Sequence, residues 1–480
     1  MQISCVDYKK LDQGTRLDAE YYKPGFLQIE KILRKANCKL LDDVSKSIKS
    51  FGAYALCNEM VLVDQGIPFI RCKDIKEGFV DFSEVLYINE ATHRLLSKSA
   101  VTSDIVMLTM SGTVGNSTIA DPAWKYPINS NQDIAKIETN ELINPYYLTI
   151  FLNGKYGKSQ TERLPVGSIQ QHIFIWQLKG LLILVASKSF QNIIAKLYMK
   201  GTKSLSDSEV FYRDAEQILL SELGLVNWKP EHRLSFVKNF SDTQASERID
   251  AEYYQPMYEK ILNRSKDKVK TFKADEIFTF RRGDFIDTKY YTEQKTKRAY
   301  IRIKELSNIG SINSNEVIYL EDTFNDNSQN TLKENDIVMA IIGDTIGKSN
   351  LILKEFVGSY FSNNTGRFRL RPEAKDSYDP FYLETLFHSV YIQSQIERAK
   401  AQTGQPKIAD KEVKNISIPC ISLTKQKQIS NNIKKAIESK DQSKRLLDIA
   451  KRGVEIAIEK SEKEAEKWIK QQLDKAELTF

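Results

Sequence analysis

The chain has 480 residues, 41% of them hydrophobic and 28% charged, so it is long enough to bury at least two ordinary cores and its composition argues against disorder. A formal charge of +7 permits a nucleic-acid partner but is as typical of a slightly basic protein that has none. Five cysteines without a C-x-x-C pair, no signal pattern at the N-terminus and a longest apolar run at 180–186 favour a cytoplasmic protein without disulfides, structural zinc or a membrane partner.

The first distinctive segment is RLDAEYYKP at 16–24, which returns at 248–256 as RIDAEYYQP, an offset of 232. Four further landmarks return in the same order. IRCK at 70–73 matches IRIK at 301–304, DIVM occurs at 104–107 and 336–339, TVG at 113–115 matches TIG at 345–347, and SN occurs at 130–131 and 362–363. Their offsets are 231 for the first and 232 for the others, which predicts that the whole half is duplicated.

Between the first copy of this motif and residue 186, short β-type runs are separated by turn residues. The runs at 68–70, 85–88, 104–109 and 133–137 predict strands. Helical apolar spacing predicts helices at 90–97 and 145–153, the second with Asn144 as its N-cap and Pro145 in its first turn. The predicted fold class is therefore mixed α/β, with two repeated globular domains.

A long helical segment follows each globular domain. Residues 187–223 predict one helix, loosened around 201–208 and ended by Gly224, and residues 423–477 carry a near-heptad pattern with Lys and Glu on the other faces. As single helices they would be about 55 Å and about 80 Å long, too long to bury an apolar stripe within their own domains. We expect them to pack antiparallel as a coiled coil, with the globular domains at opposite ends under a pseudo-two-fold axis.

These elements predict four regions along the chain. Residues 1–186 form the first globular domain, 187–226 the central helix, 227–421 the second globular domain and 422–480 the distal helix.

Two strings would suit a nucleotide hydrolase or a nuclease. GDTIGKS at 343–349 ends like a phosphate-binding loop, but three residues separate its glycines where that loop needs four, and the matching SGTVGNS at 111–117 lacks the lysine. A repeated strand–turn–strand motif explains both copies.

Asp284 or Asp287 with Glu293 and Lys295 would form a metal-dependent D…ExK set, a pattern that arises readily by chance in a chain rich in Lys and Glu. No catalytic residue, metal ligand or bound cofactor is predicted, which favours a binding or organising protein.

The ordered duplication resembles a known family. The two RxDAEYYxP motifs, the IRxK segments, DIVM followed by TxG, a loop at Gly404 followed by ISIP at 416–419 and Gln428, and the long helix after each half are similar to the specificity (S) subunit of type I restriction-modification systems. The resemblance implies a non-catalytic subunit with two target recognition domains, each of which recognises one part of a split double-stranded DNA sequence. It implies two modification (methyltransferase) subunits as partners, which would bind S-adenosylmethionine, and it leaves open ATP-dependent restriction subunits as further partners.

For DNA binding, Lys and Arg side chains would contact phosphates, and amide or guanidinium groups would contact base edges in the major groove. The predicted DNA-binding residues are Arg71, Lys73, Asn131, Gln132, Arg281, Arg282, Arg302, Lys304, Lys348, Asn363, Asn364, Arg367, Arg369 and Arg371.

Two groups among these residues have distinct expectations. Arg71 with Lys73 and Arg302 with Lys304 recur at matching positions, and for these residues a structural salt bridge on a strand edge is an equal alternative. The three arginines at 367, 369 and 371 would share one face of a strand and form a DNA-facing stripe. The tyrosine pairs Tyr21-Tyr22 and Tyr253-Tyr254 lie in an acidic segment, which favours packing within the domain or docking of the methyltransferase partner over DNA contact.

A coiled-coil scaffold without DNA affinity remains a further alternative at this stage, beside the hydrolase and the nuclease. Salt-dependent DNA binding would distinguish the scaffold from the specificity subunit.

Overall fold

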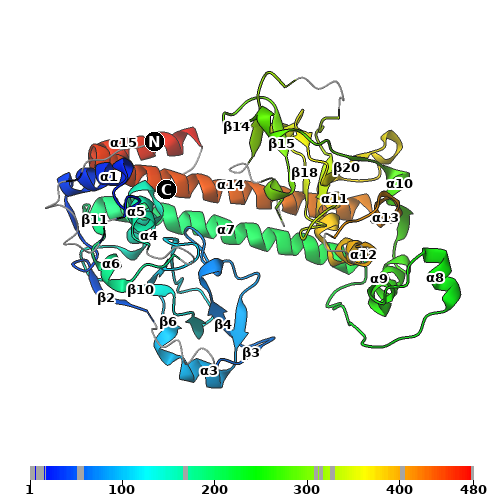
Figure 1. Cartoon of the computed structure of the whole chain (residues 1–480), viewed down its shortest axis with the longest axis horizontal. Coiled ribbons are helices and arrows are strands. Elements are labelled where there is room, and N and C mark those ends of the chain that lie inside the picture. Colours follow the sequence, from blue (N-terminus) through cyan, green and yellow to red (C-terminus); the bar gives the residue numbers. More distant parts are fainter. Residues whose placement is uncertain are drawn as a thin grey trace. The chain divides into compact units, whose positions relative to one another are not determined.

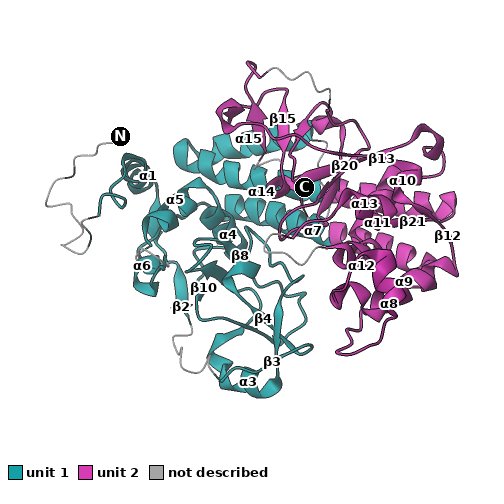
Figure 2. Cartoon of the chain, turned by 45° about the vertical axis from the view of Figure 1, so that its right-hand side comes forward, with its two compact units in different colours: residues 1–206, 440–480 teal, residues 207–439 magenta. Residues whose placement is uncertain are grey.

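The computed structural model describes residues 18–50, 59–165, 171–307, 317–324, 330–400 and 406–476, together with Val6, Arg16 and Ile312. The chain forms two compact units. Unit 1 comprises Met1–Ser206 and Lys440–Phe480, and unit 2 comprises Asp207–Ser439 (Figure 2). Both units combine sheets with helices, so the predicted mixed α/β class is confirmed. The predicted loop at Gly404 lies outside the described residues.

Unit 1 contains two sheets and a separate ribbon (Figure 1). Four antiparallel strands form the first sheet in the order β2-β10-β7-β8, and the second has the order β3-β5-β4-β9-β6 with β4 and β9 parallel. The ribbon pairs β1 with β11. The strands are β1 Cys38–Leu40, β2 Ser45–Lys49, β3 Leu62–Val63, β4 Ile67–Ile70, β5 Leu86–Ile88, β6 Ala100–Val101, β7 Val106–Thr109, β8 Ser117–Ile119, β9 Ile128–Ser130, β10 Ile134–Thr139 and β11 Leu182–Leu184.

Unit 2 has the same plan. Its sheets have the orders β13-β20-β17-β18 and β14-β16-β15-β19, with β15 and β19 parallel, and its ribbon pairs β12 with β21. The strands are β12 Lys270–Lys273, β13 Phe278–Arg282, β14 Tyr291–Thr292, β15 Ala299–Ile301, β16 Ile318–Leu320, β17 Ile337–Ala340, β18 Ser349–Leu351, β19 Tyr360–Phe361, β20 Thr365–Leu370 and β21 Ser417–Cys420. The predicted duplication is therefore confirmed at the level of sheet topology.

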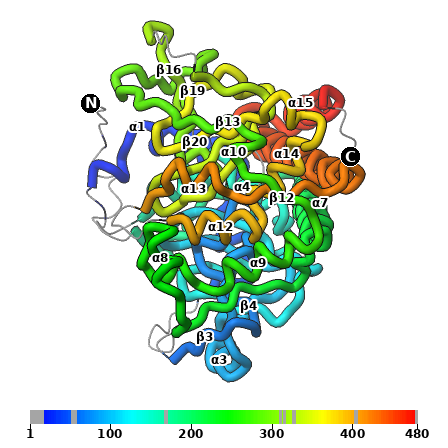
Figure 3. Tube along the Cα trace, turned by 90° about the vertical axis from the view of Figure 1, so that its right-hand side faces the viewer, coloured from blue at the N-terminus to red at the C-terminus, as the bar shows by residue number. Residues whose placement is uncertain are grey.

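Helices complete both units. Those within unit 1 are α1 Pro24–Lys35, α3 Glu90–Leu95, α4 Pro145–Asn153, α5 Lys155–Arg163, α6 Ile175–Lys179 and α15 Glu462–Lys475, with 3₁₀ turns η2 Cys72–Asp74 and η3 Ser97–Ser99. Those within unit 2 are α8 Phe240–Ser246, α9 Pro256–Lys266, α10 Ala274–Ile277, α11 Pro380–His388, α12 Val390–Ala399 and α13 Asp410–Asn415, with 3₁₀ turns η4 Glu252–Tyr254, η5 Thr288–Tyr290, η6 Ile303–Glu305, η7 Lys354–Phe356 and η8 Pro372–Ala374. Figure 3 faces unit 2, where α9 and α13 both contact α12.

Backbone pairing corrects part of the predicted correspondence between the halves. Asp104 and Asn335 have the positive φ angles, 62° and 69°, that precede β7 and β17. DIVM at 104–107 therefore corresponds to residues 335–338, not to the second DIVM. The predicted offset of 232 is wrong by one position here, because side chains alternate between faces along a strand and only the hydrogen-bond ladder fixes which face each one takes.

The same shift applies to the repeated Ser-Asn dipeptide. Ile70 pairs with Ser130 in unit 1, and Ile301 pairs with Phe361 in unit 2, so the second copy of Ser-Asn lies one position further along. An additional residue in the turn at 343–347, compared with 112–115, restores the offset of 232 at the second glycine.

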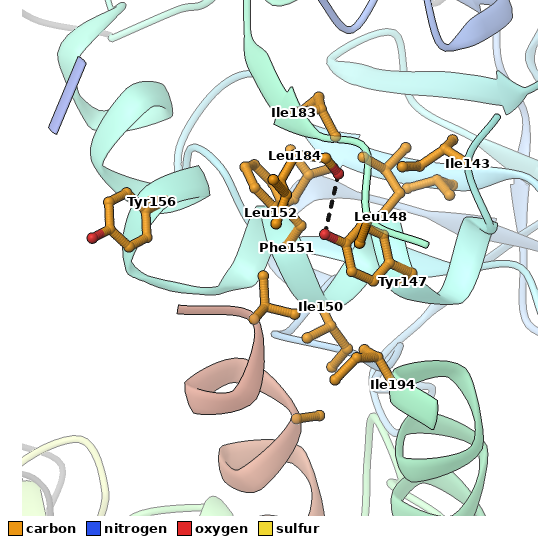
Figure 4. Packing of buried hydrophobic residues seen from close by; sticks show 14 of the residues in the cluster. Ile143, Tyr147, Leu148, Ile150, Phe151, Leu152, Tyr156, Ile183, Leu184 and Ile194 are labelled. Carbon is orange, nitrogen blue, oxygen red and sulfur yellow. Dashed lines mark hydrogen bonds between the residues drawn. The ribbon is translucent and has the colours of Figure 1, made fainter. Parts of the chain in front are cut away.

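Helix α4 anchors the core of unit 1. The Asn144 side chain accepts hydrogen bonds from the amides of the next turn, at 2.9 Å from Tyr146, so the predicted N-cap is confirmed. Tyr147 is fully buried, and its hydroxyl donates to the Leu184 carbonyl oxygen at 3.1 Å. Figure 4 shows the apolar side chains of α4 packed toward Ile183, Leu184 and Ile194.

Helix α11 has the equivalent role in unit 2. Asp379 caps it, and the buried Tyr382 hydroxyl donates to the Pro419 carbonyl oxygen at 2.7 Å. In the same core, Phe278, Phe368 and Phe387 form edge-to-face pairs with centroid separations of 5.0 to 6.0 Å. The two cores are thus organised by the same tyrosine–carbonyl bond.

Two long helices, α7 Lys188–Glu222 and α14 Leu423–Glu459, contribute residues to both units. In unit 1 Gly201 lies against Leu447, and Ile194 lies near Gly453. In unit 2 the Ser208 hydroxyl donates to the Ala436 carbonyl oxygen at 2.8 Å, and further along Glu222 pairs with Lys425 at 3.3 Å. Residue numbers fall along α14 as they rise along α7, so the predicted antiparallel direction is confirmed within each unit. Helix α7 is continuous, so the predicted loosening at 201–208 is wrong.

The predicted single helix over 423–477 is also wrong. Ser461, with φ −165°, ends the helical path, and its hydroxyl accepts the Glu464 amide at 3.3 Å as the N-cap of α15. Helix α15 buries Ile469 against Gly453 of α14. Its first residue, Glu462, accepts the Ser187 amide at 3.0 Å and so places a carboxylate at the N-terminus of α7.

Candidate nucleic-acid interface

Several predicted DNA-binding residues lie where β7 ends and β10 begins. The Met110 amide donates to the Asp133 carbonyl oxygen at 2.8 Å, and the Ile173 amide donates to the Met110 carbonyl oxygen at 2.8 Å, so three chain segments meet there. We call residues 111–116, 131–133 and 172 the loop edge of unit 1. Asn131 and Gln132, both partly exposed, belong to it.

Unit 2 has an equivalent loop edge, formed by residues 342–348, 362–364 and 407. Here the Ile341 amide donates to the Asn364 carbonyl oxygen at 3.0 Å, and the Ile408 amide donates to the Ile341 carbonyl oxygen at 3.1 Å. Lys348 and Asn363 lie on the same edge. The structure therefore gathers five predicted residues at the loop edges, two in unit 1 and three in unit 2.

The string GDTIGKS forms the turn between β17 and β18, and SGTVGNS forms the turn between β7 and β8. Gly347 and Gly115 have φ angles of 95° and 82°, and their amides return to the preceding strands at 3.0 Å. A strand follows each turn, whereas a phosphate-binding loop requires a helix whose first N–H groups point at the phosphates. The predicted strand–turn–strand motif is confirmed, and this geometry gives the hydrolase hypothesis no support.

Arg71 and Arg302 follow strands β4 and β15, which end at Ile70 and Ile301, and cap the 3₁₀ turns η2 and η6. The Arg71 guanidinium lies 2.9 Å from an Asp74 carboxylate oxygen, and Arg302 binds Glu305 in the same way, with 3.1 Å from Nε to Oε1. The two carboxylate side chains are 4% and 0% exposed. The salt-bridge alternative thus describes both arginines.

Lys73 and Lys304 lie beside these pairs and are exposed, Lys73 at 3.5 Å from the Glu84 carboxylate. DNA contact by them and by the two arginines stays a prediction.

The expected arginine stripe is only partly a surface. Arg367 lies on β20 and is 4% exposed, so the expectation of an open DNA-facing stripe is wrong at this position. Arg369 lies on the same face, with Nε and Nη2 each 2.7 Å from the buried Asp336 carboxylate. The stripe is covered because neighbouring residues on this face of the sheet pack with residues of β15 and β19 in one core cluster. Arg371, beyond the strand, donates to the Asp275 carbonyl oxygen at 3.0 Å.

Lys136 of unit 1 occupies the position of Arg367. Lys136 lies opposite Met107 on β7, as Arg367 lies opposite Val338 on β17, and Lys136 is 5% exposed. Burial lowers the pKa of Lys136 to about 8, and burial also lowers the pKa of Arg367. Among the described residues the Lys136 amine has no hydrogen-bond partner. Each central strand therefore carries a cation that is costly to bury.

The remaining predicted cations of unit 2 differ in their exposure and in their partners within the chain. Arg281 is exposed and lies opposite Arg367 across β13 and β20. Arg282 binds the Asp410 carboxylate at 2.6 Å and the Ile408 carbonyl oxygen at 3.2 Å. Lys348 is partly exposed in its turn. Arg281 and Lys348 are thus the more available of the three for a phosphate.

The repeated RxDAEYY motif packs onto the helix that follows α4 or α11. In unit 1 the Tyr21 ring lies between two guanidinium groups, 4.7 Å from Arg16 and 4.0 Å from Arg163 of α5. Arg16 also binds Asp18 at 2.7 Å, and the buried Tyr22 hydroxyl donates to the Arg16 carbonyl oxygen at 3.1 Å.

Unit 2 repeats this arrangement. Tyr253 lies 4.7 Å from Arg248 and 4.5 Å from Arg398 of α12, and the buried Tyr254 donates to the Arg248 carbonyl oxygen at 2.8 Å. The predicted packing role describes both tyrosine pairs. Partner docking by Tyr21, Tyr22, Tyr253 and Tyr254 stays a prediction, and burial leaves Tyr22 and Tyr254 little surface for it.

The two aspartates of the nuclease hypothesis have local structural partners. Asp284 accepts a hydrogen bond from Asn330 at 3.0 Å, and Asp287 caps the turn η5. Across the described residues, no three His, Cys, Asp or Glu side chains are grouped as metal ligands. In the same part of the chain, no helix has the length and apolar character required to cross a bilayer.

Three residues of the loop edges were not predicted from the sequence. Asp133 and His172 lie in unit 1, with 3.8 Å between a carboxylate oxygen and Nδ1, and Lys407 takes the place of His172 in unit 2. The only sequence signal is the isoleucine that follows both His172 and Lys407. This isoleucine shows that His172 and Lys407 are equivalent only once the strand pairing is known, and a comparison of the two sequence halves does not reveal the pairing.

Part of the chain is similar to a known family. Residues 266–448 match the family model of the type I restriction modification DNA specificity domain. No curated protein sequence matches the chain significantly.

Solved structures that are similar to this chain at low identity include two restriction-modification subunits. The type I restriction-modification S subunit from M. genitalium is 13% identical, with 91% of this chain and 95% of that chain covered and a TM-score of 0.44. The HsdS subunit from Thermoanaerobacter tengcongensis is 14% identical, with 92% and 95% covered and a TM-score of 0.27.

Proposed function

Because residues 266–448 belong to the type I restriction-modification DNA specificity domain family, we propose that the chain is the DNA-recognition subunit of such a system, with one target recognition domain in each unit. The chain itself carries out no chemistry in this proposal. Its two globular regions, 1–186 and 227–421, recognise the two parts of a split DNA sequence, and the helical regions 187–226 and 422–480 set the distance between them.

The observation that carries the proposal is the duplicated topology. The family match covers mainly unit 2, and unit 1 repeats the sheet orders of unit 2 strand for strand in the four-stranded sheet and in the ribbon. A domain that binds DNA in unit 2 therefore has a counterpart in unit 1. Two such domains of different surface chemistry suit an asymmetric target in two parts.

In this proposal, electrostatic attraction provides much of the affinity of each domain for double-stranded DNA. Exposed cations such as Lys73, Lys304 and Arg281 would bind phosphates, which supplies affinity without sequence information. Amides at the loop edges, such as those of Gln132 and Asn363, would donate to and accept from base edges in the major groove. The +7 charge of the chain favours this association.

The partners in this proposal are modification subunits, two of them, because two recognition domains of one topology offer two equivalent docking places. These subunits would bind S-adenosylmethionine and methylate a base that is rotated out of the duplex. ATP-dependent restriction subunits would join the same assembly. The Tyr21-Tyr22 and Tyr253-Tyr254 segments are the proposed docking places on this chain.

The test is to co-express the chain with its cognate modification subunits and to sequence methylated host DNA. We expect methylation at one sequence in two parts, separated by a fixed number of unspecified bases, and none when the chain is omitted. Methylation at an uninterrupted sequence would contradict two separate recognition domains. DNA binding by the complex that does not weaken as salt is raised would favour a scaffold without DNA affinity of its own.

A further inference from the structure

We propose that three equivalent side chains at each loop edge determine which bases that unit recognises. They are Gln132, Asp133 and His172 in unit 1 and Asn363, Asn364 and Lys407 in unit 2. The inference rests on the proposed function and adds to it the residues that select the sequence.

The equivalence of these positions follows from backbone geometry. Asp133 and Asn364 provide the carbonyl oxygens that accept the amides of Met110 and Ile341, at 2.8 and 3.0 Å. Their preceding residues are therefore equivalent as well, which pairs Gln132 with Asn363.

The third position is defined by the strand segment beside the turn. His172 forms a β-bridge with Ser111, and Lys407 forms a β-bridge with Ile342, in the same antiparallel sense. Each set of three side chains is thus held on the same backbone frame.

In unit 1 the three side chains offer both hydrogen-bond donors and acceptors. The Asp133 carboxylate and the His172 ring are 3.8 Å apart, and their side chains are 15% and 22% exposed. The His172 ring is held edge-to-face against Phe174 at 4.9 Å between centroids. A carboxylate accepts from the amino groups of cytosine or adenine, and the Gln132 amide both donates and accepts.

In unit 2 the same positions carry no carboxylate. Asn363 and Asn364 provide amides, which suit the N6 and N7 groups of adenine, and the exposed Lys407 provides an amine, which suits the acceptors of guanine. At the equivalent turn position, Asn116 of unit 1 is replaced by Lys348, whose backbone makes the same strand contact. The loop edge of unit 2 is therefore richer in cations and donors.

Side chains that hold the frame do not differ in this way. Gln160 binds the amide and carbonyl of Leu182 at 2.8 and 3.0 Å, and Gln395 binds those of Ser417 at 2.7 and 3.1 Å. The glutamines that bind the backbone are therefore the same in both units, whereas the side chains at the loop edge differ. This is the pattern expected of two domains that recognise different sequences on one scaffold.

The experiment transfers the three side chains of the second loop edge to the first, in the full complex with modification subunits. The variant Gln132→Asn, Asp133→Asn, His172→Lys is incubated with a randomised duplex DNA pool, and retained DNA is sequenced. This measurement needs binding but not methylation. The control is Gln28→Asn with Lys31→Gln, two exposed residues of α1 in the same unit.

We expect the variant to enrich a sequence that is altered in one part and unchanged in the other part and in the spacing, while the control enriches the original sequence. An unaltered sequence, or alteration of both parts, overturns the inference. If this variant enriches no sequence, the reciprocal variant Asn363→Gln, Asn364→Asp, Lys407→His is tested in the same experiment and should alter the other part of the sequence. If neither variant enriches an altered sequence, the inference is overturned. If the unsubstituted complex enriches no two-part sequence, the proposed function fails instead.

Discussion

Units 1 and 2 share the strand order of one four-stranded sheet and of the ribbon, but their equivalent positions differ in how closely the residues agree. Positions where a side chain binds the backbone are the same or nearly so in both units, as in the caps Asn144 and Asp379 and the tyrosines Tyr147 and Tyr382. Positions on the loop edges and on the covered face of the central strand differ, such as Lys136 and Arg367. The comparison teaches that side chains whose hydrogen bonds to the main chain hold the two cores are kept in both units, while polar side chains at the loop edges and on the covered face have diverged.

The largest effect is expected where a scaffold arginine meets a buried carboxylate. Arg302→Ala leaves Glu305 without its guanidinium partner, and Arg71→Ala does the same to Asp74, so each should lower the free energy of unfolding by about 3 kcal/mol. Urea unfolding measures the loss, and hydrogen exchange by mass spectrometry assigns it to one unit.

Arg302→Lys separates this role from a phosphate contact. A lysine keeps the charge but not the two-point contact, so the variant should remain destabilised. If Arg302→Lys has the stability of the unsubstituted chain while Arg302→Ala loses DNA binding, the arginine serves DNA and not the scaffold.

A second difference between the units lies in the turn glycines. A Cβ added at Gly115 would lie 2.3 Å from Oγ1 of the buried Thr161, whereas one added at Gly347 would meet the flexible end of Gln393 at 2.5 Å. Both glycines have positive φ. Gly115→Ala should therefore cost about 3 kcal/mol and Gly347→Ala about 1.5 kcal/mol in unfolding free energy. Thermal unfolding of the two variants provides the measurement. Equal losses of unfolding free energy for Gly115→Ala and Gly347→Ala would mean that the two turns are equally packed.

The buried cation of unit 1 gives an effect of opposite sign. Lys136→Met should raise the unfolding free energy at pH 7 by about 1.5 kcal/mol, because an unpaired buried charge is removed. The folded pKa of Lys136 is about 8 and its ordinary value is 10.5, so between these values the unfolded chain binds more protons. Stability therefore rises with pH across this window, and the penalty is fully present below it.

The measurement is urea unfolding of the Lys136→Met variant and the unsubstituted chain from pH 7 to 10. Their difference should shrink as pH rises. Lys49→Met, on the exposed residue opposite Lys136, is the control and should show no such trend. A difference that is constant with pH would mean that Lys136 is solvated in the folded chain.

The smallest effect is expected at the paired tyrosines. Tyr147→Phe and Tyr382→Phe each remove a hydroxyl that binds a buried carbonyl, so each should cost about 1 kcal/mol, and the two losses should be equal. Denaturant midpoints of the two variants provide the measurement. A loss confined to one variant would show that the common core bond matters in one unit alone.

The sequence predicts much of the scaffold, because the responsible signals are local. Asn144 before Pro145 identifies a helix start, Gly224 identifies a helix end and has a φ of 69°, and short β-type runs between turn residues identify β4 and β7. The duplication is also visible, since the RxDAEYY motif keeps its letters in both halves.

What the sequence does not reveal depends on which strands pair. The register shift at Asp104 and Asn335 is hidden by two identical DIVM strings, and the burial of Arg367 depends on a second sheet formed by distant parts of the chain. The same holds for the loop edges, where Asp133 and His172 come together from segments that are far apart in the sequence. The break at Ser461 had a local signal, a serine three positions before Glu464, but the heptad pattern on both sides obscured it.

The pairing of α15 with unit 1 has a consequence for the order in which the chain is made. Unit 2 is one continuous stretch, Asp207–Ser439, whereas unit 1 requires both Met1–Ser206 and Lys440–Phe480 from the far end. On a ribosome, unit 2 is therefore fully synthesised before unit 1 is, although unit 1 is begun first. Until Glu462 has been made, the N-terminus of α7 lacks this carboxylate, so truncation of the chain before residue 462 should destabilise unit 1 more than unit 2.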